Sequence, residues 1–386
     1  MTAKITKQYS TSTLMTFHPK ILITGASGFI GGALAAKLLA SNEASDALFL
    51  IRSSKPEEGM VRLVNTLRNH GITTEQLLQL RLEQILCGDL NVVNRWIDDP
   101  RLNSVENIVS CAALASFGNN AAIWPTNVDG VLNMAHGLSH RCSLRRFIQI
   151  GTAMACGVSS PNPVPEGYDA GIETQHFLEY THSKYEVERR LKEELPNLPL
   201  IIARPSIVVG HTKLGCKASG SIFWVFRMAS LLKAFPCTLD QKIDVVPVDY
   251  CADALYLLLT KPKLKYDSYH ISAGEKHSSS FFEIDEAIAK ATGRAKIEGY
   301  QQKSYEQILK MKDQFKTLLG QCNPRIVAKA IKTYGNFSAL ELAFDNLRII
   351  EEGMSEPTPL AMYAGLCELT SKGILISEQM KFDYKS

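Results

Sequence analysis

Short apolar runs alternate with stretches of helical periodicity along the first half of the chain. Six of these runs predict buried strands, at residues 20–24, 47–53, 84–90, 107–113, 146–151 and 198–204. The stretches between them predict helices, among them residues 57–69, 124–140 and 177–194. Strands that are apolar throughout and alternate with helices are typical of a parallel sheet covered on both faces. The pattern therefore predicts an α/β fold with a doubly wound parallel sheet.

The alternation becomes irregular after Pro205. Residues 220–234 form a very apolar helical stretch, whose periodicity fits either core packing or the wall of an apolar substrate pocket. We expect a surface loop at residues 261–265, a helix at 281–292, and mostly helical structure at 305–386. These stretches predict a smaller, mostly helical lobe over the C-terminal edge of the sheet.

The chain divides into three expected segments. They are a flexible polar tail at residues 1–19, a domain that holds the sheet at 20–210, and a substrate-binding lobe at 211–386 with some elements returning to the sheet. The tail lacks the apolar run of a signal peptide, and no stretch has the length and apolarity of a membrane span. We therefore expect a cytoplasmic protein.

Three glycines, Gly25, Gly28 and Gly31, follow the first predicted strand and open the first predicted helix. Gly25 can take the tight turn, Gly28 allows the backbone to approach a phosphate, and Gly31 allows the helix to pack closely on the strand. A glycine triplet alone is a weak signal. A strand, a turn and a helix N-terminus in this order form the arrangement that binds a pyrophosphate. The segment therefore predicts a dinucleotide-binding domain of the Rossmann type.

The end of the second predicted strand bears on the choice of cofactor. NAD-specific sites commonly place an acidic residue there, but this chain has Arg52. A guanidinium can bind a 2′-phosphate bidentately, so Arg52 favours NADPH, and a solvated arginine at a strand end is the plain alternative. Arg62 is a second candidate contact. Asp89 is placed to meet the adenine, and the small Ala112 and Ala113 let the cofactor lie across the sheet edge.

Tyr180 and Lys184 are four residues apart on a predicted helix, so the phenol and the ammonium share one face. This spacing by itself mostly marks a solvated helix face. Here it follows the glycine-rich turn and a predicted strand that leads into Thr152. The combination predicts a catalytic site.

On these residues the chain resembles the extended short-chain dehydrogenases/reductases, and more narrowly their thioester-reductase and fatty-acyl-CoA-reductase branch. The broad resemblance rests on Gly25, Gly28, Gly31, Thr152, Tyr180 and Lys184. The narrow one rests on Ile51-Arg52, Arg62-Leu63, Gly88-Asp89-Leu90, Ala112-Ala113, Asn127-Val128, Ala203-Arg204-Pro205 with Gly210, Val246-Pro247-Val248-Asp249-Tyr250 and Phe344-Asp345-Asn346. The chain departs from the branch at Ser110-Cys111, where a histidine is frequent, and at Gly151, where a serine precedes the threonine. Residues 294–336 match no motif of the branch.

The resemblance implies a role for each residue of the catalytic set. Tyr180 is the general acid that protonates the substrate oxygen, and Lys184 is expected to lower the phenol's pKa from about 10 and to hold the nicotinamide ribose. Thr152 is expected to donate a hydrogen bond to the same oxygen. Asn127 either orders a proton-relay water or is a buried helix amide. The implied cofactor contacts are Gly25, Ser27, Gly28, Phe29, Ile30, Gly31, Arg52, Arg62, Asp89, Leu90, Ala112, Ala113, Asn127, Tyr180, Lys184, Pro205 and Ile207.

The implied function is the NADPH-dependent reduction of an acyl thioester to an aldehyde, with a further step to the alcohol left open. The length leaves no room for an adenylation or carrier domain, so we expect the thioester to arrive on coenzyme A or on a separate acyl carrier protein. An NADP-dependent ketone or aldehyde reductase, or an epimerase, is the alternative on the same scaffold. A non-catalytic dinucleotide sensor is the alternative from another class, and the complete catalytic set disfavours it because a sensor needs no acid.

Composition excludes several other classes. Hydrophobic residues at 45% and charged residues at 21% are ordinary for a globular protein, and a formal net charge of +3 gives no sign of a nucleic-acid partner. The nine cysteines contain no CxxC pair, so we expect reduced, mostly buried thiols. His136 and His140 have the spacing of a metal pair but no nearby third ligand, which favours two solvated helix residues and no metal. The sequence carries no signal of a particular oligomeric state.

Overall fold

The computed structural model describes residues 17–380 except residues 117, 119, 218, 220, 295 and 296. Most of the expected tail, residues 1–16, lies outside the described residues. Seven parallel strands form one sheet in the order β11-β6-β5-β4-β1-β2-β3. Their bounds are β1 Ile21–Thr24, β2 Ala47–Ile51, β3 Ile85–Cys87, β4 Asn107–Ser110, β5 Arg146–Ile150, β6 Leu200–Pro205 and β11 Ser268–Ile271. The predicted doubly wound parallel sheet is confirmed.

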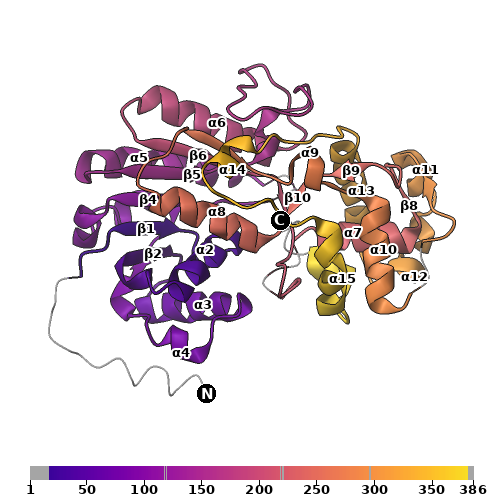
Figure 1. The fold of residues 1–386 in the computed structure, drawn as a ribbon, viewed down its shortest axis with the longest axis horizontal. Helices are drawn as coiled ribbons and strands as arrows, with labels where there is room; N and C mark the ends of the chain where they lie inside the picture. Colours follow the sequence, from indigo (N-terminus) through magenta and orange to yellow (C-terminus); the bar gives the residue numbers. More distant parts are fainter. Residues whose placement is uncertain are drawn as a thin grey trace.

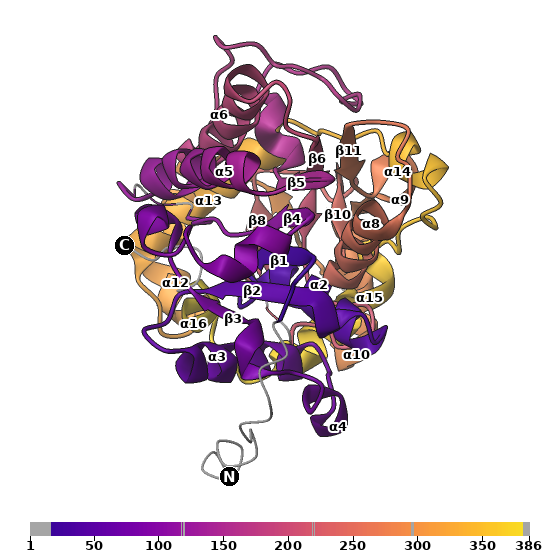
Figure 2. The ribbon, with the colours of Figure 1, turned by 90° about the vertical axis from the view of Figure 1, so that its left-hand side faces the viewer.

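Helices cover both faces of this sheet (Figures 1 and 2). One face carries α2 (Phe29–Ala40), α3 (Pro56–Asn69) and α8 (Val248–Thr260), and the other carries α5 (Gly130–Arg141) and α6 (Glu179–Glu194). Successive strand residues point to opposite faces, so each strand supplies both cores. In β1, for example, Ile23 joins the core under α2 and Leu22 joins the core under α5. This double burial explains why the strands read as continuous apolar runs.

Two predicted helices differ from the pattern at their N-terminal ends. The helix expected at residues 177–194 begins at Glu179, after an extended Leu178. The helix expected at residues 124–140 opens with a π-helical turn at Pro125–Asp129 before the regular helix α5.

The sequence pattern does not predict the edge strand β11. Two of its four residues, Ser268 and His270, are polar, so the segment does not read as an apolar run. Both are buried in the structure, and distant segments supply hydrogen-bond partners to His270. The backbone N–H of His270 donates to the Glu166 carboxylate at 2.8 Å, and its Nδ1 lies 2.9 Å from the Asp345 carbonyl oxygen.

A second group of helices lies beside the sheet, in orange and yellow on the right of Figure 1. Its core contains the apolar stretch expected at residues 220–234, which forms α7 (Phe223–Leu232). No helix among the described residues is long and apolar enough to cross a bilayer. The remaining elements are α4 Thr74–Leu77, β7 Ile207–Val208, β8 Ala234–Phe235, β9 Lys242–Ile243, β10 Val245–Val246, α9 Gly274–His277, β12 Ser279–Ser280, α10 Phe281–Thr292, β13 Gln301–Gln302, α11 Tyr305–Leu309, α12 Phe315–Leu319, α13 Pro324–Ser338, α14 Leu347–Glu351, α15 Leu360–Ser371 and α16 Ile376–Met380.

Candidate active site

The glycine-rich turn joins β1 to α2 and leaves no room for a side chain at Gly25 or at Gly31. Gly25 has a φ of +69°, and a Cβ on it would lie 2.7 Å from the backbone nitrogen of Ala112 at the end of β4. A Cβ on Gly31 would collide with the Gly25 carbonyl oxygen. The N–H of Gly28 donates to that same oxygen at 2.8 Å. The first turn of α2 contains no acidic side chain and no side-chain cap, so its N-terminus fits an anionic phosphate group.

A cleft of about 320 Å³ runs from this turn across the ends of the strands. Eleven of the residues predicted for the site line it: Gly25, Gly28, Phe29, Ile30, Gly31, Ala113, Thr152, Tyr180, Lys184, Pro205 and Ile207. The cleft therefore joins the cofactor turn and the expected catalytic set in one cavity. The predicted residues outside its lining are Ser27, Arg52, Arg62, Asp89, Leu90, Ala112 and Asn127.

Thr152, Tyr180 and Lys184 reach the cleft from two neighbouring elements. Thr152 follows β5, and its hydroxyl oxygen accepts a hydrogen bond from the N–H of Met154 at 3.4 Å. Tyr180 and Lys184 lie one turn apart on α6. Lys184 is almost fully buried, and its Nζ donates to the carbonyl oxygen of Ile150 at 2.8 Å. The two helix residues thus sit directly over the end of β5.

The pKa values of the two helix residues are both displaced by burial. Burial lowers the pKa of Lys184 to about 8, and the nearby Glu188 carboxylate and Cys111 thiol oppose this shift. Burial raises the pKa of Tyr180 to about 12. The expectation that the phenol's pKa lies below about 10 is wrong for this structure, because burial disfavours the charged phenolate.

Asn127 does not line the cleft, and its side chain forms hydrogen bonds with residues beside the cleft. Its side chain is buried, accepts from the N–H of Leu114 at 2.7 Å, and donates to the Leu114 carbonyl oxygen at 3.2 Å. It also donates to the hydroxyl of Ser183 at 3.1 Å, and Ser183 in turn donates to the backbone carbonyl oxygen of Tyr180 at 2.8 Å. These are the contacts of a buried helix amide that ties the loop after β4 to the start of α6.

Three charged residues are expected to contact the adenosine half of the cofactor, and they lie near one another past the ends of β2 and β3: Arg52, Arg62 and Asp89. The Arg52 side chain is 68% exposed, and its Nε lies 4.0 Å from a carboxylate oxygen of Asp89. Arg62 donates to the Arg52 backbone carbonyl oxygen. Asp89 accepts from the N–H of Asn91 at 2.9 Å and so caps the next turn. Leu90 is buried in the core under α5.

The remaining predicted residues support the glycine-rich turn from behind. The Ser27 carbonyl oxygen accepts from the hydroxyl of Thr66 at 3.3 Å. The N–H of Ala112 donates to the hydroxyl of Thr24 at 3.0 Å. These contacts fix the turn against α3 and the end of β4.

The sequence analysis missed a buried acid beneath the site, Glu188. One of its carboxylate oxygens accepts from Arg204 Nε at 2.9 Å and from Arg204 Nη2 at 2.7 Å. A Cβ on Gly151 would collide with its other oxygen. This contact explains why the chain has glycine where the related branch has serine. Glu188 lies four residues after Lys184 on the same helix face, and this spacing is the signal that could have identified it.

The sequence analysis also missed residues from the C-terminal half that close the cleft. Tyr334 and Phe337 come from α13, in and just beyond the stretch that matched no motif, and both line the cleft. Nothing in their local sequence marks them, because only the packing of α13 among the other C-terminal helices brings them to the site.

The remaining predictions concern the cysteine thiols and the pair His136 and His140. All nine cysteines are unpaired, as expected, and six of them are buried. His136 lies 3.1 Å from a Glu194 carboxylate oxygen, and His140 is exposed. Among the described residues no group of three or more potential metal ligands occurs.

The chain matches one known family and is similar to several curated proteins. The profile of a family described as "Male sterility protein" matches residues 23–255. The curated "Aldehyde reductase lnaA" of Aspergillus flavus is 24% identical over 250 residues, which are 60% of this chain and 23% of that protein. "Fatty acyl-CoA reductase wat" of Drosophila melanogaster is 23% identical over 280 residues, which are 61% of this chain and 53% of that protein. The chain therefore spans about a quarter of the first relative's length and about half of the second's.

Solved structures share the fold over nearly the whole chain. The terminal R domain of the myxalamid PKS-NRPS biosynthetic pathway has a TM-score of 0.72 at 18% identity, covering 97% of this chain and 98% of that one. The reductase domain of a non-ribosomal peptide synthetase from Mycobacterium tuberculosis has a TM-score of 0.66 at 18% identity, covering 92% of each chain.

Proposed function

The chain belongs to the male sterility protein family, and from that premise we propose that it reduces an acyl thioester to an aldehyde with NADPH. The observation that carries this proposal is the single cleft that contains the glycine-rich turn together with Thr152, Tyr180 and Lys184. The name of one relative supports it, since that relative is a fatty acyl-CoA reductase.

The cofactor proposal rests on the glycine-rich turn in the cleft and on Arg52 outside the cleft lining. The bare N-terminus of α2 suits a pyrophosphate, and the exposed guanidinium of Arg52 at the end of β2 suits a 2′-phosphate. Lys184, over the end of β5, is positioned to hold the nicotinamide ribose. When bound, the nicotinamide supplies the hydride that reaches the thioester carbonyl carbon.

The residues of this chain would then manage charge on the substrate oxygen. Tyr180, with a pKa of about 12, carries its proton at neutral pH and can donate it to that oxygen. The Thr152 hydroxyl accepts from the backbone N–H of Met154, so its own hydrogen is available for the same oxygen. Collapse of the resulting hemithioacetal expels a thiol and leaves the aldehyde.

The same set of residues would also serve an ordinary carbonyl reductase, which the name of the Aspergillus relative favours. The two functions differ in the thiol, because only thioester reduction releases one. The test is to measure NADPH oxidation and free thiol together on acyl-CoA thioesters, with a correction for the protein's own cysteines. Thiol should equal NADPH oxidised if reaction stops at the aldehyde, and half of it if the alcohol forms. NADPH oxidation on aldehydes with no thiol from any thioester would support the carbonyl reductase instead.

A further inference from the structure

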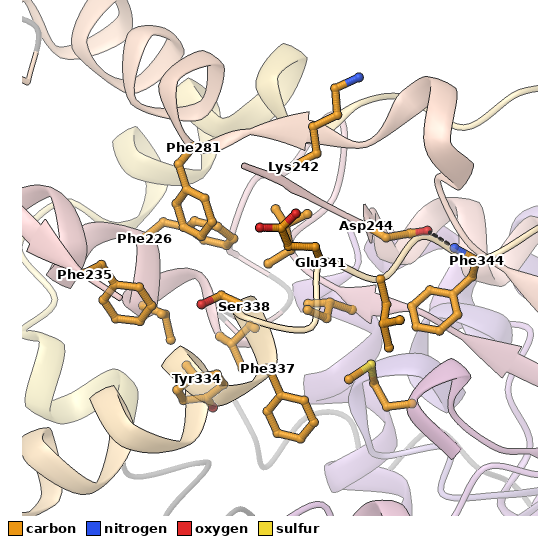
Figure 3. Close-up of a pocket in the computed structure, with 16 residues that line it drawn as sticks. Phe226, Phe235, Lys242, Asp244, Phe281, Tyr334, Phe337, Ser338, Glu341 and Phe344 are labelled. Carbon is orange, nitrogen blue, oxygen red and sulfur yellow. Dashed lines mark hydrogen bonds between the residues drawn. The ribbon is translucent and has the colours of Figure 1, made fainter. Parts of the chain in front are cut away.

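A second, smaller cavity adjoins the cleft on the side of the C-terminal helices (Figure 3). We call it the apolar chamber. Five residues line both the chamber and the cleft, so the two spaces are neighbours with a common wall: Met154, Ile207, Ile222, Tyr334 and Phe337. Met154 is two residues from Thr152 along the chain. An acyl group bound at Thr152 and Tyr180 would have to pass between these shared residues to enter the chamber.

The far wall of the chamber consists of three phenylalanines from three elements. Phe226 belongs to α7, Phe235 to β8 and Phe281 to α10, and all three are buried. The ring centroid of Phe281 is 5.6 Å from that of Phe226 and 6.4 Å from that of Phe235. Figure 3 shows the three rings gathered at one end of the cavity. Their mutual packing fixes the wall, since each ring is held by its neighbours.

Most residues that line the chamber are apolar, and the charged ones are Lys242, Asp244 and Glu341. Glu341 is exposed, and Figure 3 shows its carboxylate between Asp244 and the phenylalanines. The hydroxyl of Ser338 donates to the Gly335 carbonyl oxygen at 2.9 Å.

Asp244 is buried, but its carboxylate accepts from the N–H groups of Ala273 at 2.7 Å, Gly274 at 3.2 Å and Phe344 at 3.2 Å. Lys242 is exposed and extends away from the phenylalanines in Figure 3. An occupant therefore meets mainly aromatic and aliphatic surface, which favours an apolar group.

The chamber is small. Its volume is about 50 Å³, and one water needs about 10–15 Å³ of such space, so it holds roughly three to five water-sized groups. A methylene is about as large as a water molecule. Only a few carbons of an acyl group can therefore enter before they meet the three phenylalanines.

We propose that the apolar chamber selects a compact apolar acyl group and that Phe281 sets its upper size. The inference rests on the proposed thioester reductase activity. The expected substrates have about four to six carbons in the acyl group, straight or branched, whereas a phenyl ring exceeds the capacity of the chamber. Long-chain acyl groups are disfavoured because the wall blocks them.

The test is a chain-length series on the full chain, read as kcat/KM for thiol release with NADPH. Straight acyl-CoA thioesters from acetyl to palmitoyl are compared with isovaleryl-CoA and phenylacetyl-CoA. Each methylene that enters the chamber should raise kcat/KM about fourfold, up to about six carbons, and longer chains should lose that gain. A value that rises steadily to palmitoyl, or that is flat across the series, overturns the proposal.

Two neighbouring residues of α10 supply the variant and its control. Phe281→Leu shortens the wall and should move the preferred chain about two carbons longer. Phe282→Leu makes the same chemical change at a side chain that is 42% exposed and outside the chamber lining, and should leave the preference unchanged. If Phe281→Leu does not fold, Phe226→Leu tests the same wall. An unchanged preference in the folded wall variant contradicts the role of Phe281.

The outcomes separate this inference from the proposed function. If thiol is released but the preferred acyl chain is not the one expected, the proposed thioester reduction is retained and the chamber does not select the acyl group. No thiol from any member of the series removes the proposed function, and the inference falls with it.

Discussion

Glu188 and Arg204 form a buried ion pair beneath the cleft, with 2.7 Å between a carboxylate oxygen and Nη2. The pair links α6, which carries Tyr180 and Lys184, to β6, the strand between β5 and the edge strand β11. Arg204 also donates through Nη1 to the carbonyl oxygen of Tyr168 at 3.0 Å. The ion pair therefore fixes the helix that holds the expected acid relative to the sheet.

We expect this pair to be strongly coupled in a double-mutant cycle. Glu188→Leu alone leaves a buried guanidinium without its carboxylate, and Arg204→Met alone leaves a buried carboxylate without its cation. Each single change should cost about 3–5 kcal/mol of unfolding free energy. The double variant should be less destabilised than either single one, since it buries no unpaired charge. Midpoints of urea unfolding give the four values, and additive effects would contradict the coupling.

The elements that the sequence predicts well are those whose signal is local. The strands of the sheet centre are continuous apolar runs, and Gly25, Gly28 and Gly31 stand at fixed spacing after one of them. The pair Tyr180 and Lys184 is likewise local, because one helical turn brings the two side chains to one face. Such patterns need no knowledge of distant segments.

The elements that the sequence does not predict depend on tertiary contacts. His270 can lie in the edge strand β11 because Glu166 and Asp345, far away in the chain, bond to it. Phe337 reaches the cleft only through the position of α13. The helix α7 shows why periodicity left two interpretations open, since one helix can pack in a core and also line a cavity. Its Trp224 is fully buried in the core, and its Phe226 lines the apolar chamber.

Arg52→Glu should reverse the cofactor preference. A carboxylate at this exposed position would repel a 2′-phosphate, and loss of a charge-assisted contact costs about 1.5–3 kcal/mol. NADPH affinity should therefore fall about ten- to a hundredfold, with little change for NADH. Titrations of both cofactors measure this. Arg68→Glu, near the end of α3, is the matched control, and equal preferences in Arg52→Glu and the parent would exclude Arg52 from the cofactor site.

Tyr180→Phe should remove the proton donor and keep the ring. A positioned acid typically contributes about 10²–10⁴-fold, so kcat should fall by that order with NADPH binding little changed. Tyr185→Phe is the matched control, because Tyr185 lies on the same helix and its hydroxyl lies 3.3 Å from the Asp169 carboxylate instead. Single-turnover rates and cofactor titrations on both variants measure the effect. Unaltered turnover would remove Tyr180 from the mechanism, whereas lost cofactor binding would make it structural.

The pH dependence should identify Lys184 as the group that limits activity at high pH. Burial lowers the pKa of Lys184 from 10.5 to about 8, whereas that of Tyr180 is raised to about 12. As pH rises through about 8, the ammonium that would hold the ribose is lost while the phenol keeps its proton. The value of kcat/KM should therefore fall above pH 8.

Stability should change in the opposite direction over the same range. An unfolded lysine stays protonated to about pH 10.5, so between pH 8 and 10.5 the unfolded state binds more protons than the folded state. Lys184 therefore makes the free energy of unfolding rise with pH while activity falls. A loss of activity caused by general unfolding would show both quantities falling together.

Glu188→Gln tests the assignment, because the Glu188 carboxylate raises the pKa of Lys184 against the effect of burial. Without that charge the high-pH loss of kcat/KM should begin at a lower pH. Glu186→Gln is the control, since Glu186 lies on the same helix but pairs with Arg189 at 2.7 Å, and its profile should match the parent. The profiles are measured at temperatures where circular dichroism shows each variant folded. If kcat/KM begins to fall at the same pH in Glu188→Gln and in the parent, a group other than Lys184 causes the fall.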